Sequence, residues 1–371
     1  MNTACHHVWL GLDISAQKDF APCCKWQGKT AKSWDEYLTS PEIAQAKQQM
    51  LAGEWPSACE QCQTQEEHGI PSKRQIDQTH IYLRPEDPWN QTPLKYLSIS
   101  FGNTCNIACR ICNSQSSSKW LAEAKTLKSQ WPVIDVYPHN HFYRDSDFME
   151  PLKQMTKDMD RVEVIGGEPF LSGVEQQLEF LDHLIAHGGE HISIGYTTNG
   201  TQWPAQEFWD RWKHFKHVAI NFSMDSTGAE FEYNRWPAKW DQVQKHVFRM
   251  RDSIANTNMT IDTIFTVNVF TVASLGKFNK WSLKNRLPLP HYNILYHPTY
   301  YDARILPMNA KQIICRDPAL PKSIKSWLLE KDMSDQLTDF VKLTKMQDAM
   351  RKQDFTQTFP TLYNLIKDHY A

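Results

Sequence analysis

Short strand-like segments alternate with amphipathic helical segments from about residue 95 to residue 300, and this alternation restricts the fold more than any other feature. In the intervening helical segments apolar residues recur three and four positions apart. Alternating β and α units form a parallel sheet with right-handed crossovers. Six such units suit either an open doubly wound sheet or a partial barrel, and in both the chemistry lies at the carboxyl ends of the strands. The six strand-like segments are residues 97–101, 161–165, 191–195, 218–222, 261–267 and 292–296.

The two flanks of this α/β region differ from it in composition. The segment 84–93 is rich in proline, which resists both helix and central strand and therefore marks a boundary. Residues 323–371 have a helical pattern whose apolar positions are suited to covering one end of the sheet. We therefore expect a small cysteine-rich domain over 1–92, the α/β domain over 93–305 and a helical extension over 306–371.

Charge and hydropathy exclude some classes of function. The net charge of the 371-residue chain is −2, so no global positive field attracts nucleic acid or an anionic membrane. The first residues lack a signal-peptide pattern, and no stretch approaches the roughly 20 apolar residues that span a bilayer. We expect a cytoplasmic protein without a membrane partner, and a nucleic-acid partner is disfavoured. Clustered cysteines in that compartment bind metal or carry out redox chemistry.

Three of the nine cysteines form a compact motif directly after the first strand-like segment. Cys105, Cys109 and Cys112 have the spacing C-x-x-x-C-x-x-C. Three thiolates on one loop can bind three irons of a [4Fe–4S] cluster, which leaves the fourth iron open for a chelating ligand. The alternatives are buried structural cysteines or part of a zinc site, but zinc normally takes four closed ligands.

This motif resembles that of the radical S-adenosylmethionine (SAM) superfamily. The resemblance implies a partial (β/α)6 barrel in which SAM binds the open iron and is cleaved reductively to a 5′-deoxyadenosyl radical. Cys105, Cys109 and Cys112 would then be both metal ligands and catalytic residues. The electron would come from a donor such as flavodoxin or ferredoxin. The resemblance covers about residues 95 to 300.

Further positions at the strand ends match the same family in the same order. The resemblance implies that the glycine-rich turn after the second strand and polar residues after later strands contact SAM. Ile111 departs from the pattern, because the residue before the third cysteine is often aromatic in the family; this change weakens stacking on adenine. The implied cofactor contacts are Gly166, Gly167, Glu168, Pro169, Asn199, Ser223, Asp225 and Asn268.

A second set of cysteines precedes the α/β region. Cys5, Cys23, Cys59 and Cys62 would complete a four-thiolate site, with Cys24 as the alternate for Cys23. Such a site holds either Zn²⁺ or an iron–sulfur cluster, and spacing alone does not choose between them. The arrangement resembles the twitch or SPASM-type modules of radical SAM enzymes, which implies one auxiliary [4Fe–4S] cluster. Here the module would precede the barrel instead of following it.

The combined features predict an enzyme that abstracts a substrate hydrogen atom. We expect oxidative modification or C–X bond formation on a peptide or protein side chain. The same chemistry on an amino-acid-derived small molecule is the first alternative, and a zinc-binding scaffold without catalysis is the second. A tRNA- or rRNA-modifying enzyme is disfavoured by the charge balance.

Overall fold

The computed structural model describes residues 3–77 and 94–370, and the centre of the fold is one eight-stranded sheet. All neighbouring strands are parallel except β1 and β2, which are antiparallel. The strand order is β2-β1-β3-β4-β5-β6-β7-β8, with β2 and β8 at the two edges. The strands are β1 (Gly11–Ile14), β2 (Phe20–Ala21), β3 (Tyr96–Ser100), β4 (Arg161–Ile165), β5 (Ser193–Thr198), β6 (His217–Ser223), β7 (Met259–Val267) and β8 (His291–Ile294).

Strands β3 to β8 correspond to the six strand-like segments of the sequence, which confirms a mainly parallel α/β sheet. The linear strand order is that of an open sheet, so the curvature of a partial (β/α)6 barrel stays a prediction. The boundary at residues 92 and 93 and the proline-rich segment 84–93 lie outside the described residues.

The N-terminal segment extends this sheet. Strand β1 pairs in parallel with β3, with Gly11 opposite Tyr96 and Ile14 opposite Ile99. All four residues of β1 are buried. The cysteine-rich segment is therefore joined to the α/β region through main-chain hydrogen bonds, which brings its metal-ligand candidates close to the sheet.

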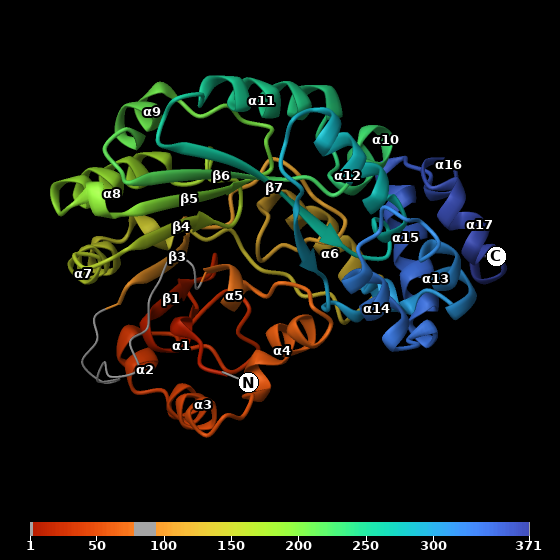
Figure 1. Cartoon of the computed structure of the whole chain (residues 1–371), viewed down its shortest axis with the longest axis horizontal. Coiled ribbons are helices and arrows are strands. Elements are labelled where there is room, and N and C mark those ends of the chain that lie inside the picture. The colour runs from red at the N-terminus through yellow and green to blue at the C-terminus, as the bar shows by residue number, and fades with distance from the viewer. Residues whose placement is uncertain (1–2, 78–93, 371) are drawn as a thin grey trace.

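Helices cover the sheet and its ends. In Figure 1, α8, α9 and α11 lie along the upper side of the sheet and the N-terminal helices lie below it. The sequence explains such elements locally: α3 begins where the Ser40 side chain accepts a hydrogen bond from the Ile43 amide, with Pro41 in the first turn. Helix α11 buries Val243, Val247 and Met250, the apolar stripe expected from their spacing.

The helices of the N-terminal segment are α1 (His6–Leu10), α2 (Trp34–Leu38), α3 (Pro41–Leu51), α4 (Glu60–Glu67) and α5 (Lys73–Asp77). Those of the α/β region are α6 (Leu121–Gln130), α7 (Ser146–Met155), α8 (Val174–Ala186), α9 (Gln206–Trp212), α10 (Gly228–Asn234), α11 (Trp240–Ser253) and α12 (Leu275–Lys284). The C-terminal helices, blue in Figure 1, are α13 (Met308–Ile314), α14 (Lys322–Glu330), α15 (Leu337–Arg351), α16 (Phe355–Thr358) and α17 (Pro360–Tyr370).

The C-terminal helices pack as the sequence pattern predicts. Trp327, Leu328, Phe340 and Leu343 are each almost fully buried, which accounts for the apolar positions of the tail. Within the described ranges, no helix has both the length and the apolar character needed to cross a bilayer.

Candidate cluster and cofactor site

The three cysteines of the central motif lie on the loop that follows β3. Their side chains are half-buried. The loop is held against residues 234–236 by two main-chain hydrogen bonds, one from the Ala108 amide to the Trp236 carbonyl and one from the Arg110 amide to the Asn234 carbonyl, both 2.7 Å. The Trp120 indole nitrogen donates to the Cys109 carbonyl at 2.7 Å. The loop is therefore fixed from both sides before any metal binds.

Two side chains donate hydrogen bonds to the sulfurs of this loop. Asn199 Nδ2 lies 3.7 Å from Cys105 Sγ, and Arg235 Nη1 lies 3.7 Å from Cys109 Sγ. Arg235 also forms an ion pair with Asp225 at 2.8 Å. Hydrogen bonds and positive charge near the sulfurs stabilise thiolate ligands and tune the reduction potential of an iron–sulfur cluster.

Without a metal, the three sulfurs favour the protonated form. Burial raises the pKa of Cys105 to about 11. Burial and the two neighbouring sulfurs raise the pKa of Cys112, while burial raises the pKa of Cys109 against the opposing charge of Arg235. A metal that binds all three thiolates removes this mutual repulsion, so the donor set fits an iron–sulfur cluster.

The glycine-rich turn after β4 packs against the same loop. Gly166 and Gly167 have φ values of +75° and +55°, which side chains rarely adopt. A β-carbon at Gly166 would overlap the Ser100 side chain, and one at Gly167 would overlap the Thr104 carbonyl. The protein's own packing therefore requires these glycines, in addition to any need for backbone approach by a ligand.

Glu168 lies inside the protein beneath this turn. Its carboxylate is fully buried and accepts hydrogen bonds from the Thr198 hydroxyl and the Asn199 amide, both at 2.7 Å, and from the Phe170 amide at 3.3 Å. Burial raises the pKa of Glu168 to about 7 against these donors. The carboxylate joins the ends of β4 and β5 and has no face free for a ligand.

Most other predicted cofactor contacts are engaged in the same way. Asp225 accepts from the Thr266 amide at 2.9 Å besides pairing with Arg235. The Asn268 side chain donates to the Thr266 carbonyl at 3.0 Å and accepts from the Phe270 amide at 2.9 Å. The Pro169 carbonyl accepts from Gln177 at 2.6 Å. These groups shape the strand ends, and Ser223 lines a cavity at the sheet.

The four N-terminal cysteines meet in one place. Cys5, Cys23, Cys59 and Cys62 line a single small cavity, with about 10 Å³ left between the side chains. Burial raises the pKa of Cys5, and the charges of Cys62 and Cys59 raise it further. Burial and Cys62 likewise raise the pKa of Cys59 to about 12. Cys24 lies apart from this group, on a larger cavity at the sheet.

The sulfur spacing bears on which metal fits. Among the described residues, no three cysteine sulfurs lie within 4.8 Å of one another. Tetrahedral zinc with bonds of about 2.3 Å holds its sulfurs about 3.8 Å apart. The spacing is therefore wider than a zinc site requires at both cysteine sets.

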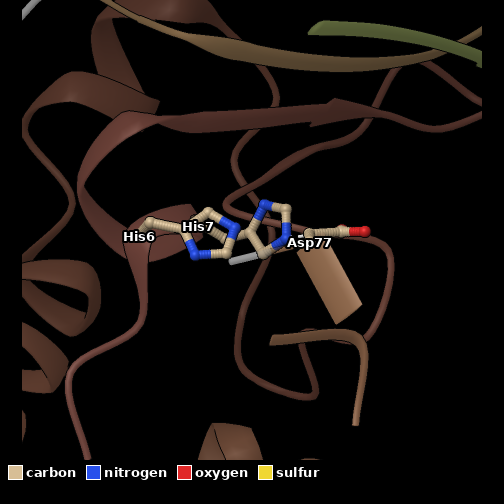
Figure 2. Close-up of side chains that lie close together, drawn as sticks. All are labelled: His6, His7 and Asp77. Atoms are coloured by element: carbon tan, nitrogen blue, oxygen red, sulfur yellow. Dashed lines mark hydrogen bonds and ion pairs between the residues drawn. The ribbon is translucent and has the colours of Figure 1, made fainter. Parts of the chain in front are cut away.

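A third cluster of ligand-type side chains lies beside Cys5. His6, His7 and Asp77 are buried and lie in a row with the His7 ring in the middle (Figure 2). His7 Nε2 lies 2.9 Å from Asp77 Oδ2, but the Lys73 ammonium lies 2.6 Å from the same oxygen. Burial lowers the pKa of His6 to about 3. Because Lys73 already neutralises the carboxylate, we assign this group a structural role in anchoring α1 to α5.

Sequence reasoning identified neither of two further cavities. One of about 320 Å³ lies beside Ile111 and Cys112 and includes Tyr137 and Tyr300 in its wall. The other, of about 360 Å³, lies between the N-terminal segment and one face of β4 to β8. The signal for the second was present: polar residues such as Asn221 occur inside strands of a parallel sheet, whose faces are usually apolar.

Comparisons with known proteins give only distant likenesses. No protein-family model and no curated protein matches the chain. Native anSMEcpe with bound AdoMet and Cp18Cys peptide is 15% identical over 57% of this chain and 53% of its own, with a TM-score of 0.42. Streptococcus suis SuiB bound to S-adenosylmethionine is 12% identical over 80% of this chain and 51% of its own, with a TM-score of 0.36. SuiB bound to precursor peptide SuiA is 12% identical over 82% and 64% of the two chains, also at 0.36. The match spans about half to two-thirds of those chains, and we base the functional proposal on the residues of this chain alone.

Proposed function

We propose that this chain is a radical SAM enzyme whose reductive [4Fe–4S] cluster is held by Cys105, Cys109 and Cys112. One observation carries the proposal: three thiols converge on one loop at the carboxyl edge of a parallel sheet, and Asn199 and Arg235 donate to two of their sulfurs. Three thiolates leave one iron of such a cluster without a protein ligand, which is the coordination that SAM requires.

The bound cluster and SAM supply a 5′-deoxyadenosyl radical that takes a hydrogen atom from the substrate. The protein residues hold the cluster and offset its charge. Arg235, neutralised by Asp225, offsets the negative charge that thiolate ligands bring into a buried place. Trp120 fixes the Cys109 main chain through its hydrogen bond to the Cys109 carbonyl. A donor of the flavodoxin or ferredoxin class would supply the electron.

We propose that Cys5, Cys23, Cys59 and Cys62 hold an auxiliary [4Fe–4S] cluster in a twitch- or SPASM-like module. The single cavity that these four residues line supports a shared metal site, and its small volume of about 10 Å³ supports the alternative, a single zinc ion. Either metal would cross-link the parts of the N-terminal segment that carry these four cysteines and so stabilise their packing on the sheet. The three-part division at residues 92 and 305 and the partial barrel also belong to this proposal.

For the substrate we propose a peptide or protein side chain that undergoes oxidative modification or C–X bond formation. A small molecule derived from an amino acid is the alternative. The cavity of about 360 Å³ on the sheet lies at the low end of the range for small-ligand pockets. This volume supports a substrate group as small as one amino-acid side chain or one amino-acid-derived molecule.

The test begins with anaerobically purified protein. Iron, sulfide and zinc are quantified, and 5′-deoxyadenosine is measured after dithionite and SAM are added. We expect iron at both cysteine sets and SAM cleavage. Joint substitution of Cys105, Cys109 and Cys112 by Ala should abolish cleavage and leave the N-terminal metal in place. Protein that contains only zinc and cleaves no SAM refutes the proposal, and loss of all metal from the triple variant refutes the division into two sites.

A further inference from the structure

The cavity between the N-terminal segment and the sheet is built from side chains of many elements. Its floor is one face of β4 to β8, and its cover comes from residues 24–25, from Gln65 and Pro71, and from α5. The floor residues that matter for binding are Arg161, Glu163, Thr197, Asn221, Ser223 and Asn293. The cover therefore comes from the same segment that carries the N-terminal cysteines.

Three polar side chains of this floor lack a hydrogen-bond partner within residues 3–77 and 94–370. Thr197, Asn221 and Ser223 are half-buried, and their side chains make no hydrogen bond to any described residue. Thr197 and Asn221 lie opposite each other in the register of β5 and β6. By contrast, the carboxylates of Glu168 and Asp225 are occupied by protein donors. Uncommitted polar groups that face a cavity are the groups a ligand can bind, because buried polar atoms otherwise find partners within the protein.

The strong charges of the cavity nearly neutralise one another. The Lys73 ammonium lies 2.6 Å from Asp77 and 3.4 Å from Glu163. Arg161 lies 2.9 Å from Glu163, which also accepts from the Tyr96 hydroxyl at 2.8 Å. Two cations and two carboxylates are thus paired within one network.

Lys25 is a further cation of the cavity and forms no ion pair with a carboxylate that the structure describes. Its Nζ donates to Asn293 Oδ1 at 2.5 Å, and no carboxylate of the described residues lies within ion-pairing distance of it. Lys25 is half-buried and lies in the wall of this cavity beside Cys24, and it also lines the small cavity of the N-terminal cysteines, where its charge acts against the raised pKa of Cys62. A charged amine held by one neutral amide in a partly desolvated place favours an anion.

We propose that this cavity is the substrate site and that Lys25 binds a carboxylate of the substrate. Asn221, with an amide that both donates and accepts, and Ser223 bind the polar groups next to that carboxylate. The proposal rests on the proposed function and narrows it to substrates that carry an acidic side chain or a free C-terminal carboxylate. Ser223, which the family resemblance assigns to SAM, is here assigned to the substrate, and Lys25 also lines the cavity of the N-terminal cysteines.

The experiment measures binding of small probes to metal-loaded protein with SAM present under anaerobic conditions. N-acetyl-glutamate N-methylamide carries only a side-chain carboxylate, and N-acetyl-glycine carries only a C-terminal one. N-acetyl-glutamine N-methylamide is the neutral match of the first probe. Binding is followed by ligand-observed NMR for the wild type, Lys25→Met, Lys25→Arg and Lys367→Met, the last a control at an exposed lysine.

We expect at least one carboxylate probe to bind the wild type and Lys367→Met, and the neutral probe to bind neither. Lys25→Met should weaken that binding about tenfold or more, the scale of a lost charge-assisted hydrogen bond, and Lys25→Arg should retain part of it. The carboxylate that binds identifies the source, side chain or C-terminus.

Equal binding to Lys25→Met, or binding of neither carboxylate to the wild type, overturns the inference. A loss of SAM affinity in Lys25→Met also overturns it, since Lys25 would then serve the cofactor. These results are independent of the proposed function, which fails instead if the wild type holds no iron and forms no 5′-deoxyadenosine. Metal content is measured in each variant, so that damage to the neighbouring cysteine site is recognised.

Discussion

An ion pair joins α15 to the loop that carries Cys105, Cys109 and Cys112, and its removal is a strong test of the structure. Arg110, between Cys109 and Cys112, is completely buried and forms an ion pair with Asp348. Its guanidinium lies 3.7 Å above the Tyr233 ring, and the Tyr233 hydroxyl donates to the same carboxylate at 2.7 Å. Asp348→Asn keeps the shape of the side chain and removes its charge, which leaves the arginine buried without a counter-ion.

The burial of the pair sets the magnitude of the effect. Removing one partner of a buried ion pair costs about 3–5 kcal/mol, because the remaining charge is uncompensated. The Asp348 side chain is 14% exposed, so water solvates the site slightly and we expect the low end, about 3 kcal/mol. At about 1.4 kcal/mol per tenfold, the unfolding constant rises about 100-fold. Replacing both partners with apolar residues, Arg110→Met with Asp348→Leu, removes both charges and should restore most of the stability.

The assay is urea unfolding of the metal-free, reduced protein, with the iron content of the reconstituted protein as a second reading. For Asp348→Asn we expect a lower urea midpoint of unfolding. We also expect a smaller amount of iron bound at Cys105, Cys109 and Cys112. Asp368→Asn, at an exposed position of α17, is the control and should leave both unchanged. A loss of under about 1 kcal/mol, or a double variant as unstable as the single one, would refute the role of this ion pair.

Three further predictions concern the site. Cys23→Ser should remove the N-terminal metal and Cys24→Ser should retain it, as measured by iron and zinc content; the reverse result would exchange their roles. Gly167→Ala should destabilise the turn by about 1–2 kcal/mol or more from its left-handed φ and weaken SAM binding in a direct binding assay, whereas unchanged values would show that the turn adapts. Burial raises the pKa of Glu168 from 4.5 to about 7, so between these pH values the folded state binds a proton that the unfolded state has lost. The free energy of unfolding therefore falls by about 3 kcal/mol as the pH rises from 4.5 to about 7. Glu168→Gln should abolish that part of the pH dependence in urea unfolding, and a variant with the wild-type pH profile would contradict the assignment.

The sequence predicted the regular part of the fold because the regular part repeats. Strands β3 to β8 each have an apolar pattern long enough to separate them from helix, and the stripe of α11 fixes its buried face. Strands β1 and β2 have four and two residues, too few for any period to show. Their place in the sheet depends on pairing with β3, far along the chain, and no local pattern encodes such a contact.

Polar residues at the strand ends were harder to assign for a different reason. A carboxylate after a strand binds a ligand or a protein donor equally well, and only the three-dimensional neighbours decide. Glu168 turned inward because the Thr198 hydroxyl and two amides lie within reach. Asn221 lines the cavity together with Thr197 and Ser223 and makes no side-chain hydrogen bond to a described residue.

The N-terminal cysteines and the sheet cavity are linked by the chain itself. Cys23 lines the small cysteine cavity, and Lys25, two residues later, lies in the walls of both cavities and contacts β8 through Asn293. Cys62 is followed within the same helix by Gln65, which also lines the cavity. A metal that fixes Cys23 and Cys62 therefore also fixes the cover of the cavity, since loop closure by a metal restricts the intervening chain. This structural role holds for zinc and for iron–sulfur alike, so loss of probe binding on metal removal would follow from either identity, and only the redox activity of the site separates the two.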